Sequence, residues 1–224
     1  MTPRKVYEDK LKKLNKNIME MGQRTEEFID KTIQAIINND NDLARSIIEQ
    51  DDVIDAMQLE IEKECALLIA HQQPVAGDLR FVISVVKIVT DLERIADQCC
   101  DICKYNIRLN DGTWSREINY KRHIEKMAFG AKAMLQEVLN AFISKDIEVV
   151  KETYKEDDKI DSIFIKIWEE ITEEMIANKD FIQNGVHYIM IIKYLERIGD
   201  HITNIAEWII YSSTGEYAIH KPIE

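Results

Sequence analysis

The chain has 224 residues, of which 46% are hydrophobic and 31% charged, a balance typical of a folded globular protein. Its 41 acidic residues outnumber its 29 Lys and Arg, and the formal net charge of -12 disfavours binding to the phosphates of nucleic acid. We expect no signal peptide, because the N-terminus is polar and lacks an apolar core, and no membrane insertion, because no stretch of 18 or more apolar residues occurs. The four cysteines show no disulfide spacing, which indicates a reducing, cytoplasmic setting.

Apolar residues recur with helical periodicity along the whole chain, and the 7 Gly and 3 Pro leave room for long helices. The polar stretch "NNDND" offers N-cap residues after the first helix. In "HQQPVAGD", Pro74 cannot continue a helix and Asp78 can cap the next one. An Asp-Gly turn signal at residues 110–115 separates two sets of three helices. The expected helices span residues 1–38, 42–70, 79–108, 117–144, 146–178 and from 180 or 185 to 211.

The second half of the chain repeats the first. The segment "DDVID" that begins at Asp51 matches "DDKID" at Asp157, 106 residues later, and "DLERIAD" at Asp91 matches "YLERIGD" at Tyr194, 103 residues later. The loop between the second and third helices is therefore about three residues shorter in the second copy. We predict an all-α fold of two tandem, pseudo-symmetric antiparallel three-helix bundles. The two units are assigned to residues 1–111 and 112–224.

Each repeat carries two pairs of acidic residues spaced four apart. Such residues lie about 40° apart around a helix, and the pair in the third helix of each repeat continues an apolar stripe. If the second and third helices are antiparallel, the start of one lies beside the end of the other. Four carboxylates would then meet at one end of each bundle. They are Asp51, Asp55, Glu93 and Asp97 in the first repeat, and Asp157, Asp161, Glu196 and Asp200 in the second.

Clustered anions that lose hydration need compensation by a raised pKa, by Arg or Lys, or by a bound cation. Arg94 and Arg197 adjoin the motifs, but a neighbour in sequence points about 100° away on a helix. We therefore expect them to pair with other helices more readily than with their own motif. All-oxygen ligand sets suit hard cations such as Mg²⁺, Ca²⁺, Mn²⁺ or Fe³⁺. The matched pairs predict a metal site in each bundle.

Two other functional classes stay open. A di-metal carboxylate enzyme of the ferritin-like type would use Glu-x-x-His pairs, which the sequence lacks. A purely structural scaffold would satisfy its carboxylates with Arg and Lys and bind no metal. The sequence has no phosphate-binding loop or nucleophile–base constellation, so we expect no enzymatic activity. Cys99, Cys100 and Cys103 do not share one helix face, which favours buried thiols over an iron–sulfur or zinc site.

Three stretches, "HQQPVAGDLR", "DLERIADQCCDI" and "YLERIGDHITNIAEW", resemble the PhoU family of phosphate-uptake regulators, and the resemblance extends over essentially the whole chain. It implies two three-helix bundles whose Glu/Asp-x-x-x-Asp motifs bind multinuclear metal clusters. It also implies a negative regulatory adaptor that contacts the ATPase of a phosphate ABC transporter and a membrane sensor histidine kinase. A homodimer is left open.

Carried over residue by residue, the resemblance nominates the eight carboxylates above as metal ligands. The family often has Asn four residues after the motif Asp; Asn204 matches it, and Asp101 stands there in the first copy. The family's Gly in Arg-Ile-Gly-Asp is Ala96 in the first copy, which we expect only to tighten packing slightly. The implied cofactors are divalent or trivalent ions on oxygen ligands, with iron, manganese, magnesium, calcium and zinc as candidates.

Overall fold

The computed structural model describes residues 3–111 and 120–216, and its regular secondary structure there is entirely helical, as predicted. The described part of the chain forms these elements: α1 (Pro3–Asn38), α2 (Asn41–Glu49), α3 (Asp51–Gln72), α4 (Ala76–Asn110), α5 (Tyr120–Ser144), α6 (Ile147–Ala177), a 3₁₀ turn η1 (Lys179–Phe181) and α7 (Ile182–Thr214). The predicted division between residues 111 and 112, the helix start at 117 and the end of the chain fall outside the described residues.

One predicted helix, residues 42–70, is two helices in the structure. The chain leaves helical geometry at Gln50 (φ -94°, ψ 1°) and α3 begins at the next residue. No Gly or Pro marks this interruption, so the sequence did not reveal it. Its counterpart α6 runs unbroken. Asp51 therefore lies in the first turn of a helix, where the helix dipole favours a carboxylate, whereas Asp157 lies well inside one.

The other helix boundaries follow local capping chemistry. The carboxylate of Asp40 accepts a hydrogen bond from the Leu43 amide at 2.9 Å and caps α2, as the polar break predicted. The prediction that Asp78 caps the following helix was wrong. Val75, in an extended conformation directly after Pro74, is the N-cap of α4, and Asp78 lies in its first turn.

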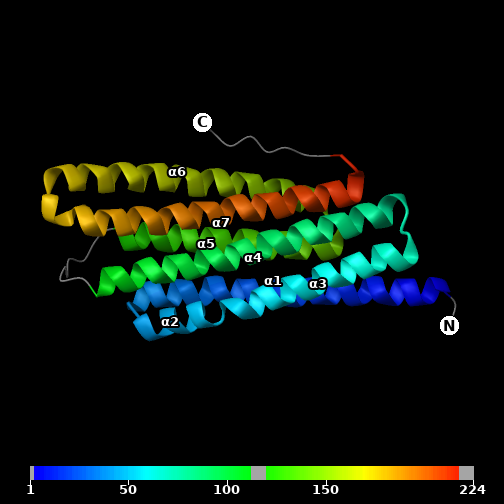
Figure 1. Ribbon diagram of the computed structural model, residues 1–224. Helices are drawn as coiled ribbons and strands as arrows, with labels where there is room; N and C mark the ends of the chain where they lie inside the picture. Colours follow the sequence, from blue (N-terminus) through cyan, green and yellow to red (C-terminus); the bar gives the residue numbers. More distant parts are fainter. Residues whose placement is uncertain (1–2, 112–119, 217–224) are drawn as a thin grey trace.

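The long helices lie side by side along one axis (Figure 1). α1, α3 and α4, with the short α2, form the first bundle, and α5, α6 and α7 form the second. The bundles join lengthwise through α4 against α7 and α1 against α5. The start of α1 and the end of α7 lie at the same end of the molecule. None of the described helices has an apolar stretch long enough to cross a membrane.

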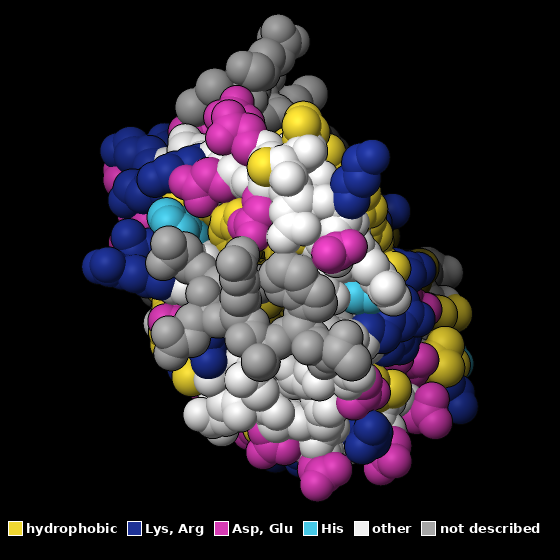
Figure 2. Space-filling model, turned by 90° about the vertical axis from the view of Figure 1, so that its left-hand side faces the viewer, with side chains coloured by type: hydrophobic (Ala, Val, Ile, Leu, Met, Phe, Trp, Pro, Cys, Tyr) yellow, Lys and Arg dark blue, Asp and Glu magenta, His cyan; other side chains and the backbone are white. Residues whose placement is uncertain are grey.

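A continuous apolar core runs through both bundles and across the contact between them. Isoleucine dominates it, and Ile95 of α4 and Ile198 of α7 are both at most 1% exposed. The end of the molecule opposite the start of α1 and the end of α7 carries acidic and basic side chains interspersed, with a few hydrophobic ones exposed (Figure 2). The mixed charges form a solvated surface around this core.

α4 and α7 run antiparallel, and their contacts repeat across the duplication (Figure 1). Asp91 of α4 accepts a hydrogen bond from Asn204 of α7 at 3.3 Å. Asp101 of α4 lies beside Tyr194 of α7, where it helps to raise the pKa of the phenol after burial. An offset of 103 residues takes Asp91 to Tyr194 and Asp101 to Asn204. The two contacts are therefore equivalent, and the bundles face each other about a local pseudo-twofold axis.

Candidate metal centres

The first cluster brings together Asp51, Asp55, Glu93 and Asp97 where α3 begins beside α4, as the antiparallel arrangement predicted. The prediction that the carboxylates lie at one end of each bundle was wrong, because they lie midway along α4 and midway along α7. Burial raises the pKa of Asp51, and the charges of Asp97 and Asp55 raise it further against a lowering by the Cys100 thiol. Burial also raises the pKa of Glu93, with the charge of Asp97 as the next cause. The four carboxylates thus act on one another as a group of like charges.

Several oxygens in this first cluster are shielded from solvent without a hydrogen-bond partner. They are Asp51 Oδ1, Asp55 Oδ1 and Glu93 Oε2. A shielded carboxylate oxygen without a donor is costly, because it has lost hydration and gained no hydrogen bond in return. Such oxygens are the chemical feature that a bound hard cation would satisfy.

Arg94 supplies part of the compensation in the first cluster. Its Nη1 donates to Asp97 Oδ2 at 2.9 Å, and its Nε lies 3.3 Å from Glu93 Oε2 without hydrogen-bonding geometry. The expectation that Arg94 would pair with another helix was therefore wrong. The side chain leaves the helix in a different direction but is long enough to fold back over the motif. Because Arg94 is 51% exposed, this pairing contributes little stability.

The second cluster lies between α6 and α7 and is built around Asp157, which is only 3% exposed. Burial raises the pKa of Asp157 to about 7, with the charges of Asp161 and Asp200 as the next causes. Its Oδ1 is shielded and has no hydrogen-bond partner. The structure thus gathers the second predicted set of carboxylates as well. Unlike Glu93 and Asp200, Asp157 has no cation among the groups that shift its pKa.

The other members of the second cluster are more accessible. Glu196 pairs with Lys193 one turn earlier in α7, at 2.7 Å. Asp200 is exposed as a residue, yet the pKa of its carboxyl is raised by partial burial and then by the charge of Glu196. Lys193 therefore compensates carboxylate charge in the second cluster, as Arg94 does in the first.

Gly199 of α7 makes room for Asp157. A Cβ at this position would lie 2.4 Å from Asp157 Oδ1, far closer than any real contact. The first repeat has Ala96 at the equivalent position, fully buried, and there the helix that carries Asp51 is interrupted at the preceding residue. The two sites are equivalent in sequence but differ in their surroundings. Asp157 lies inside an unbroken helix opposite a glycine, whereas Asp51 begins a helix and alanine takes the place of the glycine.

Two nominated residues have partners outside these clusters. Asp101 pairs with Lys104 at 2.8 Å and lies beside Tyr194. Asn204 is exposed and donates to Asp91 across the contact between the bundles. Both serve the α4–α7 interface in this arrangement, and a role as metal ligands stays a prediction for each.

Sequence reasoning missed one link between the bundles. His201 Nδ1 lies 2.9 Å from Asp91 Oδ1, and both side chains are at most 15% exposed. The sequence predicted that His201 points away from Glu196 and Asp200 on its own helix, and in the structure it contacts Asp91 of α4 instead. The missing information was the antiparallel register of α4 against α7, and this register follows from the tertiary packing.

The donor set fits a hard cation, although the side chains need to rotate to form a site. In the described part of the chain, no three His, Cys, Asp or Glu side chains already converge on one point. A bound ion would have to displace Arg94 from Glu93 and Asp97 in the first cluster. In the second cluster it would have to displace Lys193 from Glu196. The four cysteines are buried free thiols, as predicted, and burial raises the pKa of Cys99 and Cys100, so they remain neutral.

Comparison with known proteins gives the same organisation. Residues 18–105 and 124–209 each match the model of the PhoU domain, which confirms the internal duplication. The chain is 38% identical to a phosphate-specific transport system accessory protein PhoU homolog of Clostridium acetobutylicum, over 95% of this chain and 96% of that protein.

Solved structures are similar over nearly the whole length. The crystal structure of PhoU from Pseudomonas aeruginosa has a TM-score of 0.87 at 32% identity and covers 94% of this chain and 100% of that one. The phosphate transport system regulatory protein PhoU from Streptococcus pneumoniae has a TM-score of 0.86 at 31% identity, with 96% and 100% coverage. The arrangement of the two bundles is thus shared with these proteins.

Proposed function

The chain belongs to the PhoU family, and we propose that it is a metal-binding regulator of phosphate uptake. Like its relatives, it is an accessory protein of a phosphate transport system. Its finer role, in this proposal, is that of a negative regulatory adaptor in the cytoplasm. It would contact the ATPase of a phosphate ABC transporter and a sensor histidine kinase, without catalysing a reaction itself.

One observation carries the metal-binding part of the proposal: the first Asp of both repeats has a shielded oxygen without a hydrogen-bond partner, Oδ1 of Asp51 and Oδ1 of Asp157. A bound cation supplies the positive charge that these oxygens lack. Asp51, Asp55, Glu93 and Asp97 would hold one centre. Asp157, Asp161, Glu196 and Asp200 would hold the other.

Metal occupancy would also set the charge of the surface around each centre. The chain as a whole carries a formal charge of -12. Two clusters of four carboxylates concentrate part of this charge at defined places on the bundles. Neutralising them changes the field that an approaching partner meets, and such fields govern the rate and selectivity of association.

A structural scaffold without metal is the second candidate. Arg94 and Lys193 already pair with motif carboxylates, which favours this alternative in part. The ferritin-like enzyme has no comparable support, because the carboxylates gather on two pairs of helices rather than around one centre.

Metal analysis separates the two candidates. We would purify the chain without chelator, load it with Mn²⁺ or Fe³⁺, and measure bound metal after gel filtration. D51N/D55N should remove the metal of the first centre and D157N/D161N that of the second. The matched control is E169Q/E173Q, an exposed acidic pair with the same spacing on α6. No stoichiometric metal in the unaltered chain would favour the scaffold, and equal metal content in all variants would remove these carboxylates from the ligand set.

The adaptor role is tested by co-purification from cells grown with plentiful and with scarce phosphate. We expect the transporter ATPase and the sensor kinase to accompany the tagged chain, and the amounts to change with phosphate supply. Their absence under both conditions would contradict the adaptor role without affecting the metal result.

A further inference from the structure

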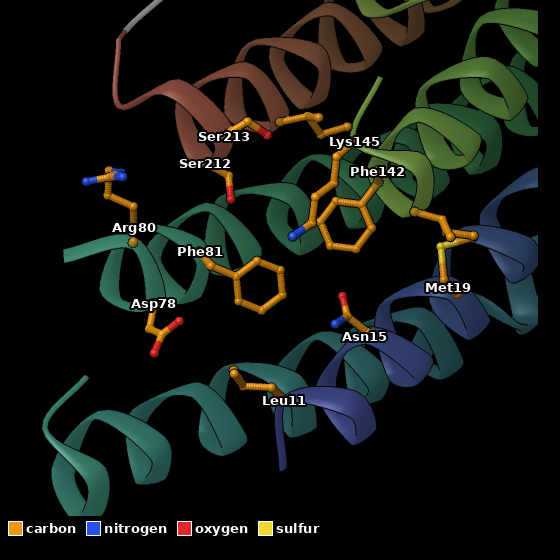
Figure 3. A pocket seen from close by; sticks show the side chains of 13 residues that line it. Leu11, Asn15, Met19, Asp78, Arg80, Phe81, Phe142, Lys145, Ser212 and Ser213 are labelled. Atoms are coloured by element: carbon orange, nitrogen blue, oxygen red, sulfur yellow. The ribbon is translucent and has the colours of Figure 1, made fainter. Parts of the chain in front are cut away.

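A cavity of about 630 Å³ opens where the two bundles meet, at the end of the molecule that carries the start of α1 and the end of α7. Four helices contribute to it, two from each repeat (Figure 3). Its volume lies in the range of small-molecule sites, which commonly form between domains. It lies away from both carboxylate clusters, since none of their residues lines it.

The floor of the cavity is apolar. Phe81 of α4 and Phe142 of α5 stack across the contact between the bundles, with ring centroids 6.0 Å apart and planes inclined by 21°. Leu11 and Met19 of α1 flank these rings (Figure 3). All four side chains are only partly buried, so the cavity offers them as an accessible apolar surface.

The rim of the cavity is polar and carries two cations. Lys145 follows the end of α5 with φ 59°, a left-handed conformation, and its side chain reaches over the cavity beside Phe142 (Figure 3). Arg80 lies at the edge, and its Nε is shielded from solvent without an acceptor. Within the described ranges, no carboxylate lies within ion-pair distance of either cation. Ser212 and Ser213 of α7 add hydroxyl groups.

Asp78 is the one carboxylate among the lining residues. The phenol of Tyr7 lies beside it, and the pKa of Tyr7 is raised to about 12 by burial and then by Asp78. Two cations against one carboxylate make this lining positive, in a chain whose overall charge is strongly negative. An amine above an aromatic floor suits a ligand with an apolar body and an anionic group.

We propose that this cavity binds a small amphiphilic anion. Its apolar body packs on Phe81 and Phe142, and its phosphate, sulfonate or carboxylate group lies against the amine of Lys145 (Figure 3). Because the lining comes from both repeats, the ligand holds the two bundles together at this end. This inference does not depend on metal binding.

Two fluorescent dyes test the need for an anionic group. Anilinonaphthalene sulfonate carries the group, and N-phenylnaphthylamine has the same rings without it. We expect the sulfonate to bind the intact chain at one saturable site, and the neutral dye to bind at least about ten-fold more weakly, as for the loss of a charge-assisted contact. Equal affinity for both dyes, or no saturable binding, would overturn the proposal.

Variants locate the site. K145Q, at an exposed position, should weaken binding of the sulfonate about ten-fold. W168S is the control, because Trp168 lines a different apolar groove between α6 and α7. Loss of binding in W168S with K145Q unchanged would assign the dye to that groove and overturn the proposal. Competition by AMP and by dodecyl phosphate then distinguishes an aromatic from an acyl ligand body.

Discussion

Asp157 and Gly199 fit together so closely that a single methyl group between them would displace the carboxylate. A Cβ on Gly199 would stand 2.4 Å from Asp157 Oδ1. A side chain at position 199 would clash with Asp157, which explains the glycine in the second motif. Periodicity and composition do not show this clash. Asp157 is only 3% exposed at this contact.

G199A should displace Asp157 and remove metal from the second centre. Alanine normally favours a helix by up to about 1 kcal/mol over glycine, but here overpacking should reverse the sign and lower the unfolding free energy by about 1–3 kcal/mol. G130A is the matched control, because its Cβ would make an ordinary 3.5 Å contact with Ile160. Urea unfolding and metal analysis measure both effects. Full metal content in G199A would show that Asp157 need not occupy its present place.

The stability of the metal-free protein should fall as pH rises from about 4 to about 7. Asp157 has a raised pKa of about 7, so the folded state holds its proton at pH values where the unfolded state has released it. The shift corresponds to a loss of up to about 4 kcal/mol on ionisation. D157N should therefore be more stable than the unaltered chain at pH 8 and similar at pH 4. Urea titrations in chelator test this, and parallel pH profiles for the two proteins would refute it.

R94Q should strengthen metal binding at the first centre. Arg94 occupies Asp97 and approaches Glu93, so an ion must displace it before these carboxylates can become ligands. We expect affinity to rise several-fold, consistent with the loss of an exposed ion pair worth up to about 1 kcal/mol. R197Q, the equivalent change in the second repeat, is the control. Isothermal titration with Mn²⁺ measures the difference, and weaker binding in R94Q would mean that Arg94 supports the site.

H201A should weaken the contact between the bundles. His201 and Asn204 both reach Asp91 across the interface of α4 and α7. Removing the imidazole leaves a largely buried carboxylate with fewer donors, at an expected cost of about 1–3 kcal/mol in unfolding free energy. A double-mutant cycle with D91N isolates the pair. A coupling energy near zero would show that the contact contributes nothing to the joining of the bundles.

The helices, the duplication and the spacing of the acidic pairs could be predicted from the sequence because they depend on local chemistry. Apolar periodicity gave the helices, and the matched offsets gave the duplication. The spacing of four put Glu93 beside Asp97 on one helix face. The interruption at Gln50 was missed because the break carries no Gly or Pro, although the acidic Asp51 and Asp52 are typical of the first turn of a new helix. The position of Arg94 was missed because a projection of the helix ignores the length and flexibility of a side chain.

The sequence by itself determined that the chain is a duplicated set of amphipathic helices with matched acidic pairs, because periodicity and repetition are properties of residue order. Only the tertiary structure decided which side chains lose water, since burial depends on helices that are distant in sequence. The packing of α6 against α7 places Asp157 against Gly199, and the antiparallel register of α4 and α7 brings His201 to Asp91. The same packing leaves a cavity between the repeats that neither repeat forms alone.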